Sequence, residues 1–98
     1  MNYQVFISPE AELDIENNYK YYESQNTGLG SEFIRAIDAS LSLIQRNPFA
    51  YPCVYRKVRR KLIRKFPYGL FYVIKDEMIV VLACFHVKRD PQQWKRRL

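Results

Sequence analysis

The sequence has few residues that bind metals and no hydrophobic run long enough to cross a membrane. It contains one histidine and two cysteines in 98 residues, whereas a metal site needs three or four converging ligands. Cys53 and Cys84 lack metal-ligand spacing and have only His86 nearby, so we expect reduced thiols, no metal and no cofactor. The longest hydrophobic run, residues 78–85, is far shorter than the roughly 20 residues that span a bilayer. Because the stretch MNYQVFISPE also lacks the pattern of a signal peptide, we expect a cytoplasmic protein without a membrane partner.

Acidic residues are scarce in the second half of the chain. Residues 51–98 hold 13 basic and 3 acidic side chains, a net charge of +10, whereas residues 1–50 hold 3 and 7, a net charge of −4. Such asymmetry indicates an acidic or polyanionic partner for the second half of this basic protein. An ordinary solvated basic surface is the alternative, and both interpretations fit the charge alone. The length of the chain suits one domain over residues 1–98.

Two neighbouring hydrophobic runs, residues 68–75 and 78–85, predict a β-hairpin. Both are rich in β-branched and aromatic residues, and Asp76-Glu77 is the candidate turn between them. Neither run alternates between apolar and polar residues, so both faces of these strands should be covered, as in the middle of a sheet. His86 follows directly, where the second strand leaves the core.

The segment after the hairpin is basic and predicts a short C-terminal helix. Asp90 is a suitable N-cap and Pro91 a suitable first-turn residue for a helix that carries Trp94. We therefore expect one charged corner at this end of the molecule, formed by His86, Lys88, Arg89, Asp90 and Trp94.

The first third of the chain predicts a strand and a helix. Residues 3–7 are a strand candidate, and Ser8 with Pro9 suits the N-cap and first turn of a helix over residues 9–24. One face of this helix should pack on the core. Its other side is expected to stay in solvent, with the carboxylates Glu10, Glu12, Asp14 and Glu16.

A second helix is predicted over residues 29–46, ending before Pro48. Residues 47–55 then form a connection over the surface. Two antiparallel helices joined by a short link form a hairpin, and the sheet is the only element left to cover its apolar side. The predicted core includes large side chains from the helix and the β-hairpin: Phe33, Ile37, Leu70, Tyr72 and Leu82.

Residues 56–66 predict an unusually basic strand, since seven of the ten residues 56–65 are cationic and none is acidic. A period of two places Arg60 and Arg64 on the same side. Burial of unpaired guanidinium groups is costly, so these charges must reach water, a partner or the edge of the sheet. Either lysine and arginine protect an edge strand, or they form a surface for phosphate or carboxylate, which arginine binds with a bidentate fork.

The predicted order is β-α-α-β-β-β followed by a short C-terminal helix, an α+β fold. Three stretches then carry a family resemblance: SPEAELDIENNYKYY, NPFAYP and VRRKLIRKFPYGLFYVIKDEMIVVLACFHVKRDPQQW. Over essentially its whole length the chain resembles the RelE/ParE-family toxins of bacterial type II toxin-antitoxin systems, and the third stretch resembles their ParE-like, plasmid-stabilisation branch. The resemblance implies a twisted antiparallel sheet packed against an α-helical hairpin. It also implies a cognate antitoxin that wraps over the toxin and forms an oligomer with it.

The resemblance implies one of two activities: RelE-like members cleave mRNA on the ribosome, and ParE-like members inhibit DNA gyrase without cleaving RNA. Cleavage needs a proton-transfer group and cations that stabilise the charged phosphorane. His86 is suited to proton transfer, and Arg60, Arg64 and Arg89 could supply the cations. The chain has no C-terminal tyrosine of the kind that many RNase members use, which favours the ParE branch.

The resulting hypothesis assigns target binding to Arg60, Arg64, Arg89 and Trp94. His86 is catalytic only if the protein is an endoribonuclease, and the alternative is a local hydrogen bond at the end of a strand. The target is DNA gyrase or, in the second interpretation, the ribosome and its mRNA. A nontoxic family member that only binds its antitoxin is the third interpretation.

Overall fold

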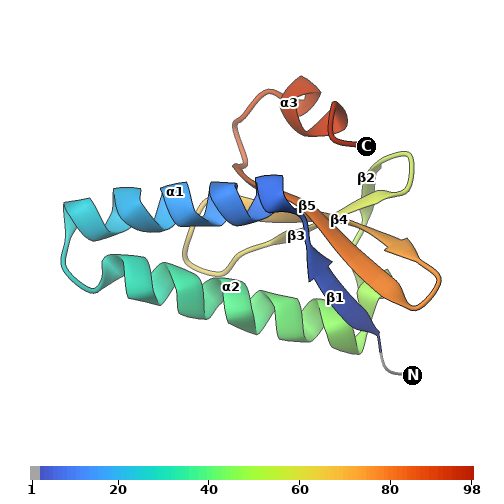
Figure 1. The fold of residues 1–98 in the computed structure, drawn as a ribbon, viewed down its shortest axis with the longest axis horizontal. Coiled ribbons are helices and arrows are strands. Elements are labelled where there is room, and N and C mark those ends of the chain that lie inside the picture. The colour runs from blue at the N-terminus through green and yellow to red at the C-terminus, as the bar shows by residue number, and fades with distance from the viewer. Residues whose placement is uncertain (1–2) are drawn as a thin grey trace.

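Two helices and a sheet form the body of the molecule, and a short third helix covers the sheet from the other side (Figure 1). The computed structural model describes residues 3–98. Its elements, in chain order, are β1 (Gln4–Ile7), α1 (Pro9–Gln25), α2 (Leu29–Arg46), η1 (Pro48–Ala50), β2 (Cys53–Tyr55), β3 (Val58–Leu62), β4 (Tyr68–Lys75), β5 (Met78–His86) and α3 (Pro91–Lys95). The predicted α+β fold class is confirmed, as are both helices of the hairpin.

The Glu23 side chain of α1 fixes the link between α1 and α2. Gly28 precedes α2 at φ +91°, where an L side chain would be strained, and glycine has no side chain that could cap the helix. The Glu23 carboxylate instead accepts hydrogen bonds from the backbone N–H groups of Gly28 and Gly30, each at 3.0 Å. A Cβ on Gly30 would lie 2.8 Å from the carbonyl oxygen of Tyr19, so glycine permits the two helices to approach closely.

The five strands form one sheet in the order β1-β5-β4-β3-β2. The hairpin β4–β5 therefore lies in the middle of the sheet. This position was predicted, because neither hydrophobic run alternates between apolar and polar residues. Three neighbouring pairs are antiparallel, but β1 runs parallel to β5, so the sheet is mixed rather than wholly antiparallel. The segment predicted as a plain connection, residues 47–55, contains η1 and the short edge strand β2.

The sheet separates two cores, and a β-bulge in the central hairpin determines which residues of β5 face each core. The register between β4 and β5 shifts between Phe71 and Tyr72, which leaves Leu82 as the extra residue of β5. Leu82 and Ala83 consequently both pack toward α3, whereas β4 alternates regularly, with Tyr72 toward the helices and Phe71 toward α3. The predicted core residues are all buried, with Phe33, Ile37, Leu70 and Tyr72 in the first core and Leu82 in the second.

The second half of β5 pairs with β4 on one side but has no strand on its other side, because β1 ends at Ile7 opposite Val81. Side chains satisfy its backbone groups instead. The Asp14 carboxylate accepts from the Cys84 N–H at 3.0 Å, the Asn18 amide donates to the Cys84 carbonyl at 3.3 Å, and Arg97 donates to the Leu82 carbonyl at 3.0 Å. Asp14 was predicted on the solvent side of its helix, but its side chain is only 12% exposed.

The buried phenol of Tyr72 predicts a sensitivity to alkali. Its hydroxyl donates to the Pro48 carbonyl at 2.6 Å, and burial raises its pKa to about 12. The unfolded value is about 10, so this stabilisation is complete below pH 10 and is lost as the pH rises through 12. We expect Tyr72→Phe to cost about 1 kcal/mol at neutral pH and to lose less stability than the unsubstituted protein between pH 10 and 12. Urea unfolding across this range measures both effects, and equal losses in the two proteins would contradict the assignment.

Candidate functional site

The structure distributes the five predicted site residues over two faces of the sheet. Arg60 lies on the α3 face, because it is two residues after Val58, which is buried in the second core, and side chains two residues apart in a strand share a face. Arg89 and Trp94 lie on the same face, against Phe85 and Phe71. His86 packs on the helix side, and Arg64 lies in the turn after β3 rather than in the strand. The predicted single corner is therefore wrong, because His86 packs on the opposite face from Arg89 and Trp94. The shared side of Arg60 and Arg64 is also wrong, because the basic strand ends at Leu62.

The α3 face consists of cations laid over aromatic rings. Trp94 is 6% exposed and stacks on Phe71 with ring centroids 4.6 Å apart. The Arg89 guanidinium lies 4.2 Å from the centre of the Phe85 ring. Gly69 pairs with Phe85 across the strands, and a Cβ on Gly69 would lie 3.0 Å from the Arg60 side chain. Arg60 and Arg89 therefore border one aromatic surface, which α3 extends.

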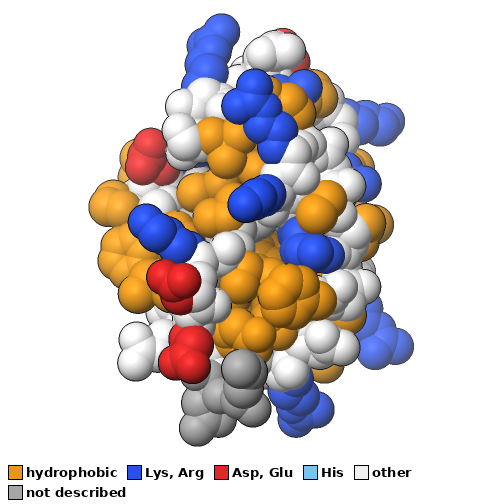
Figure 2. Space-filling view, turned by 90° about the vertical axis from the view of Figure 1, so that its right-hand side faces the viewer, with side chains coloured by type: hydrophobic (Ala, Val, Ile, Leu, Met, Phe, Trp, Pro, Cys, Tyr) orange, Lys and Arg blue, Asp and Glu red, His pale blue; other side chains and the backbone are white. Residues whose placement is uncertain are grey.

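The β2–β3 edge of the sheet also carries exposed hydrophobic side chains. Figure 2 shows the side with β1, β2 and the β4–β5 turn, where lysine and arginine side chains are spread between hydrophobic ones and acidic side chains gather along one edge. Phe49, Val54 and Leu62 are exposed large hydrophobic residues at the β2–β3 end.

His86 makes a specific local hydrogen bond. Its Nδ1 accepts from the backbone N–H of Lys88 at 3.1 Å, and a backbone N–H can only donate. The neutral imidazole must therefore carry its proton on Nε2. The ring packs edge-on against Tyr68, its cross-strand partner, at 5.3 Å between centroids.

Two tyrosines that were not among the predicted site residues lie at this end of the sheet, Tyr68 beside His86 and Tyr22 behind Tyr68. Tyr68 contacts Tyr22 of α1, with ring centroids 6.0 Å apart. Burial raises the pKa of Tyr22 to about 12, with Tyr68 contributing, and burial also raises the pKa of Tyr68. Both phenols are therefore protonated at neutral pH and can donate hydrogen bonds but cannot act as bases. The bulge pairs Tyr68 with His86, whereas a regular register from the Asp76-Glu77 turn would have paired it with Phe85.

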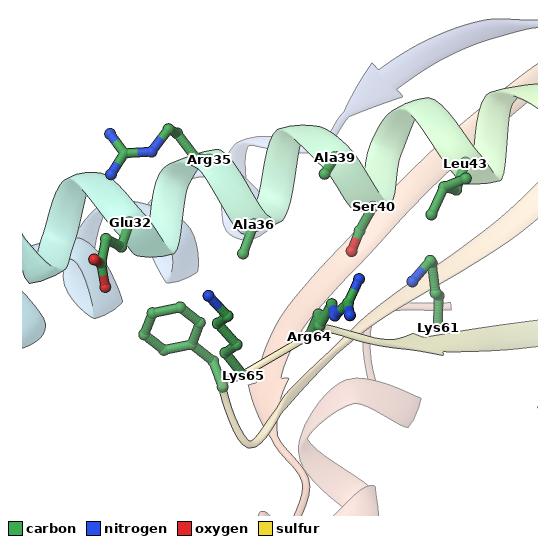
Figure 3. A pocket seen from close by; sticks show the side chains of 10 residues that line it. Glu32, Arg35, Ala36, Ala39, Ser40, Leu43, Lys61, Arg64 and Lys65 are labelled. Atoms are coloured by element: carbon green, nitrogen blue, oxygen red, sulfur yellow. The ribbon is translucent and has the colours of Figure 1, made fainter.

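A basic groove lies on the helix side, between α2 and the turn after β3 (Figure 3). Its volume is about 400 Å³. Arg64, predicted as a target contact, lines it together with Lys61 and Lys65. The three cations lie close together in the sequence, so this cluster could have been predicted. It was not, because the strand was expected to continue to residue 66 and it ends at Leu62.

Neither cysteine is in a disulfide; Cys53 is exposed and Cys84 is buried. Burial raises the pKa of the Cys84 thiol to about 12, so it stays protonated at neutral pH. Residues 3–98 contain no group of three or more His, Cys, Asp or Glu side chains placed to hold a metal ion. In the same part of the chain, no helix combines the length and apolar character needed to span a bilayer.

Fold and sequence together define the class of protein. The α+β arrangement of a helical hairpin on a five-stranded sheet is that of the RelE/ParE-family toxins. Residues 5–91 match the family model described as ParE toxin of type II toxin-antitoxin system, parDE. The chain therefore belongs to the ParE toxin family. No curated protein matches it in sequence.

Solved structures agree with this fold. The chain is similar to a structure titled "Chromosomal ParDE TA system from P. aeruginosa", with a TM-score of 0.77, 15% identity and coverage of 86% of this chain and 95% of that one. It is also similar to a structure titled "The crystal structure of the toxin-antitoxin complex RelBE2 (Rv2865-2866) from Mycobacterium tuberculosis". There the TM-score is 0.62 and the identity 17%, over 88% of this chain and 99% of the other. At these identities the likeness concerns the fold alone.

Proposed function

We propose that this ParE-family toxin inhibits DNA gyrase in the cytoplasm, without cleaving RNA, and that a cognate antitoxin neutralises it. The observation that carries the choice against cleavage is the hydrogen bond from the Lys88 N–H to Nδ1 of His86. A general base needs a nitrogen free to accept a proton. Nδ1 of the single histidine in the chain accepts this hydrogen bond, so Nδ1 could take up a proton only after the Lys88 N–H is displaced.

The α3 face is the proposed target-binding surface, with Arg60 and Arg89 as its cations and Trp94 as the side chain that positions α3. Among residues 3–98 the ion pairs are Glu16–Lys20 and Asp14–Arg97, so no carboxylate of that part neutralises Arg60 or Arg89. Unpaired cations of this kind, with Arg89 exposed and Arg60 half-buried, give an acidic partner its orientation and association rate.

Induced expression without an antitoxin tests the proposal. Plasmid supercoiling and ribosomal mRNA cleavage are followed in the same culture. Loss of supercoiling or DNA breaks with intact mRNA supports gyrase inhibition. Cut mRNA with normal supercoiling overturns it in favour of a nuclease, and growth without either change indicates a nontoxic family member.

Ribosome-dependent mRNA cleavage is the second candidate, and one observation favours it. His86 and Tyr68 lie side by side, 5.3 Å apart between ring centroids, so a proton-transfer group and a neutral phenol donor are close together. A substrate 2′-hydroxyl would have to displace the Lys88 N–H or select the other tautomer of His86 for cleavage to occur.

Replacement of His86 separates the two candidates. Under the proposal no bond is broken, so His86→Ala should leave toxicity within about threefold, since the lost contact is one modest hydrogen bond. Arg60→Ala and Arg89→Ala should each weaken gyrase inhibition by about tenfold. A nuclease would instead lose ~10²-fold or more on His86→Ala. The measurements are inhibition of gyrase supercoiling and ribosome-dependent mRNA cleavage by purified variants whose melting temperatures match that of the unsubstituted protein.

A further inference from the structure

Lys61 of β3 lies between two cavities. It lines the basic groove between α2 and the turn after β3, and it also lines a cavity of about 280 Å³ at the β2–β3 edge. Its side chain is half-buried. The Nζ atom lies 5.3 Å from the centre of the Tyr51 ring and donates a hydrogen bond to the Leu62 carbonyl at 3.1 Å. These two contacts hold the amine in place, whereas a lysine on an open surface moves freely through solvent.

The surroundings of Lys61 raise the fraction of its amine that is neutral. Burial lowers the pKa of Lys61 below its ordinary value, and among residues 3–98 no carboxylate forms an ion pair with it. Because the Leu62 carbonyl can only accept a hydrogen bond, that contact occupies an N–H group and leaves the lone pair of the neutral amine free. Desolvation is one of the ways in which proteins activate a lysine as a nucleophile.

The groove supplies cations for an anionic reactant. Figure 3 shows Lys61, Arg64 and Lys65 reaching toward α2, with the hydroxyl of Ser40 pointing toward Arg64. The one acidic residue of the lining, Glu32, lies at the end of the groove away from Lys61. Arginine binds phosphate through its bidentate fork and lysine binds it as a point charge. With a volume of about 400 Å³, the groove has room for a small phosphorylated molecule beside the Lys61 amine.

We propose that Lys61 is a site of acylation by small acyl phosphates, whose phosphate group Arg64 and Lys65 bind. The lone pair of the neutral amine forms a bond to the acyl carbon, and the bond from that carbon to the phosphate oxygen breaks. The phosphate leaves with the electron pair of that bond and takes up the proton that the nitrogen releases. The products are an amide on Lys61 and inorganic phosphate, so no oxidant or reductant is consumed. Cations that hold the phosphate also stabilise the charge that develops on it as it leaves.

Acylation changes the groove in two ways. It removes the positive charge of Lys61, and it adds an acyl group to a half-buried side chain. Ala36, Ala39 and Leu43 form an apolar stripe of α2 on the opposite wall, which gives the acyl group a surface to contact. The supply of small acyl donors thereby alters the charge of this surface of the toxin.

The test measures how fast each of the seven lysines of the purified protein is acetylated. Acetyl phosphate is the probe, and peptide mass spectrometry follows the early part of the reaction. The N-hydroxysuccinimide ester of acetic acid serves as the comparison, because it needs a neutral amine but no phosphate site. The groove variant is Arg64→Gln with Lys65→Gln. The control variant, Lys88→Gln with Arg96→Gln, removes the same two charges at exposed positions outside the groove. Thermal melting verifies that both variants are folded.

We expect acetyl phosphate to modify Lys61 about fivefold or more faster than the exposed Lys57 and Lys75. The groove variant should lose about fivefold of the rate at Lys61, and the control variant should stay within about twofold. Inorganic phosphate should slow the reaction of acetyl phosphate at Lys61 but not that of the ester.

Three results would overturn the inference. The first is a rate at Lys61 no faster than at Lys57 and Lys75, and the second is an equal loss in the groove and control variants. The third is an equal loss with both reagents in the groove variant, which would show that Arg64 and Lys65 act on the amine and do not bind the phosphate. None of these readouts involves gyrase or toxicity, so the inference and the proposed function can fail separately.

Discussion

Replacement of Trp94 by alanine is expected to lower the free energy of unfolding by about 3 to 5 kcal/mol. Trp94 is the one buried residue of α3 and fills the second core beside Phe71 and Phe85. Its removal leaves a cavity under the helix and exposes aromatic surface of the sheet. For a chain of this size the melting temperature should fall by about 12 °C or more, as calorimetry or circular dichroism can measure.

Two variants separate the anchoring role of Trp94 from a direct role in target contact. Trp94→Phe keeps an aromatic ring on Phe71 and should cost about 1 kcal/mol. Arg96→Ala removes an exposed side chain beside Trp94 and should stay within about 0.5 kcal/mol. An unchanged melting temperature in Trp94→Ala, combined with lost gyrase inhibition, would show instead that Trp94 acts as a contact residue.

Most of the fold could be predicted because its elements are encoded locally. The predicted bounds of α2 agree with the structure, since a hydrophobic stripe ends at Pro48. Ser8 and Asp90 cap their helices as predicted, each accepting a backbone hydrogen bond. The middle position of β4 and β5 followed from apolar residues on both faces of each strand. Local pattern and global fold agree at all these positions.

The elements that were missed depend on long-range pairing. β2 has three residues and two prolines before it, so neither composition nor length indicates a strand. It exists because β3 provides a neighbour. The end of β3 was placed too late, because the period of two continues through Ile63 to Phe66 although the chain already turns there, with Lys65 at φ +73°.

The residues of the candidate site were identified better than their arrangement. Cation content and the lone His86 indicated which side chains to consider. Their faces depended on the bulge beside Phe71 and on the turn around Arg64, and one residue of shift moves a side chain to the opposite face of a strand. The sequence carries no local signal for that bulge, since Phe71 and Leu82 are as suitable for a regular strand as for an irregular one.

Asp14 is the position at which a surface interpretation of the sequence was most misleading, and its replacement should have the second large effect. Its carboxylate receives two hydrogen bonds from Arg97, at 2.6 and 3.2 Å, and one from the backbone of Cys84. Asp14→Ala would leave a largely buried guanidinium without a counter-charge and a buried N–H without an acceptor. Removal of one partner of a buried pair typically costs about 3 to 5 kcal/mol, and we expect a loss of that size in urea unfolding.

Matched variants identify which part of that loss belongs to the ion pair. Glu12→Ala removes an exposed carboxylate from the same helix and should change stability by no more than about 0.5 kcal/mol. Asp14→Asn keeps an acceptor for the Cys84 N–H and should fall between the two. Because Arg97 and Asp14 interact directly, Asp14→Ala with Arg97→Met should cost less than the sum of the single changes. Strict additivity in this cycle, or a loss below about 1 kcal/mol for Asp14→Ala, would show that the open edge of β5 does not need the pair and that α3 is held by Trp94 alone.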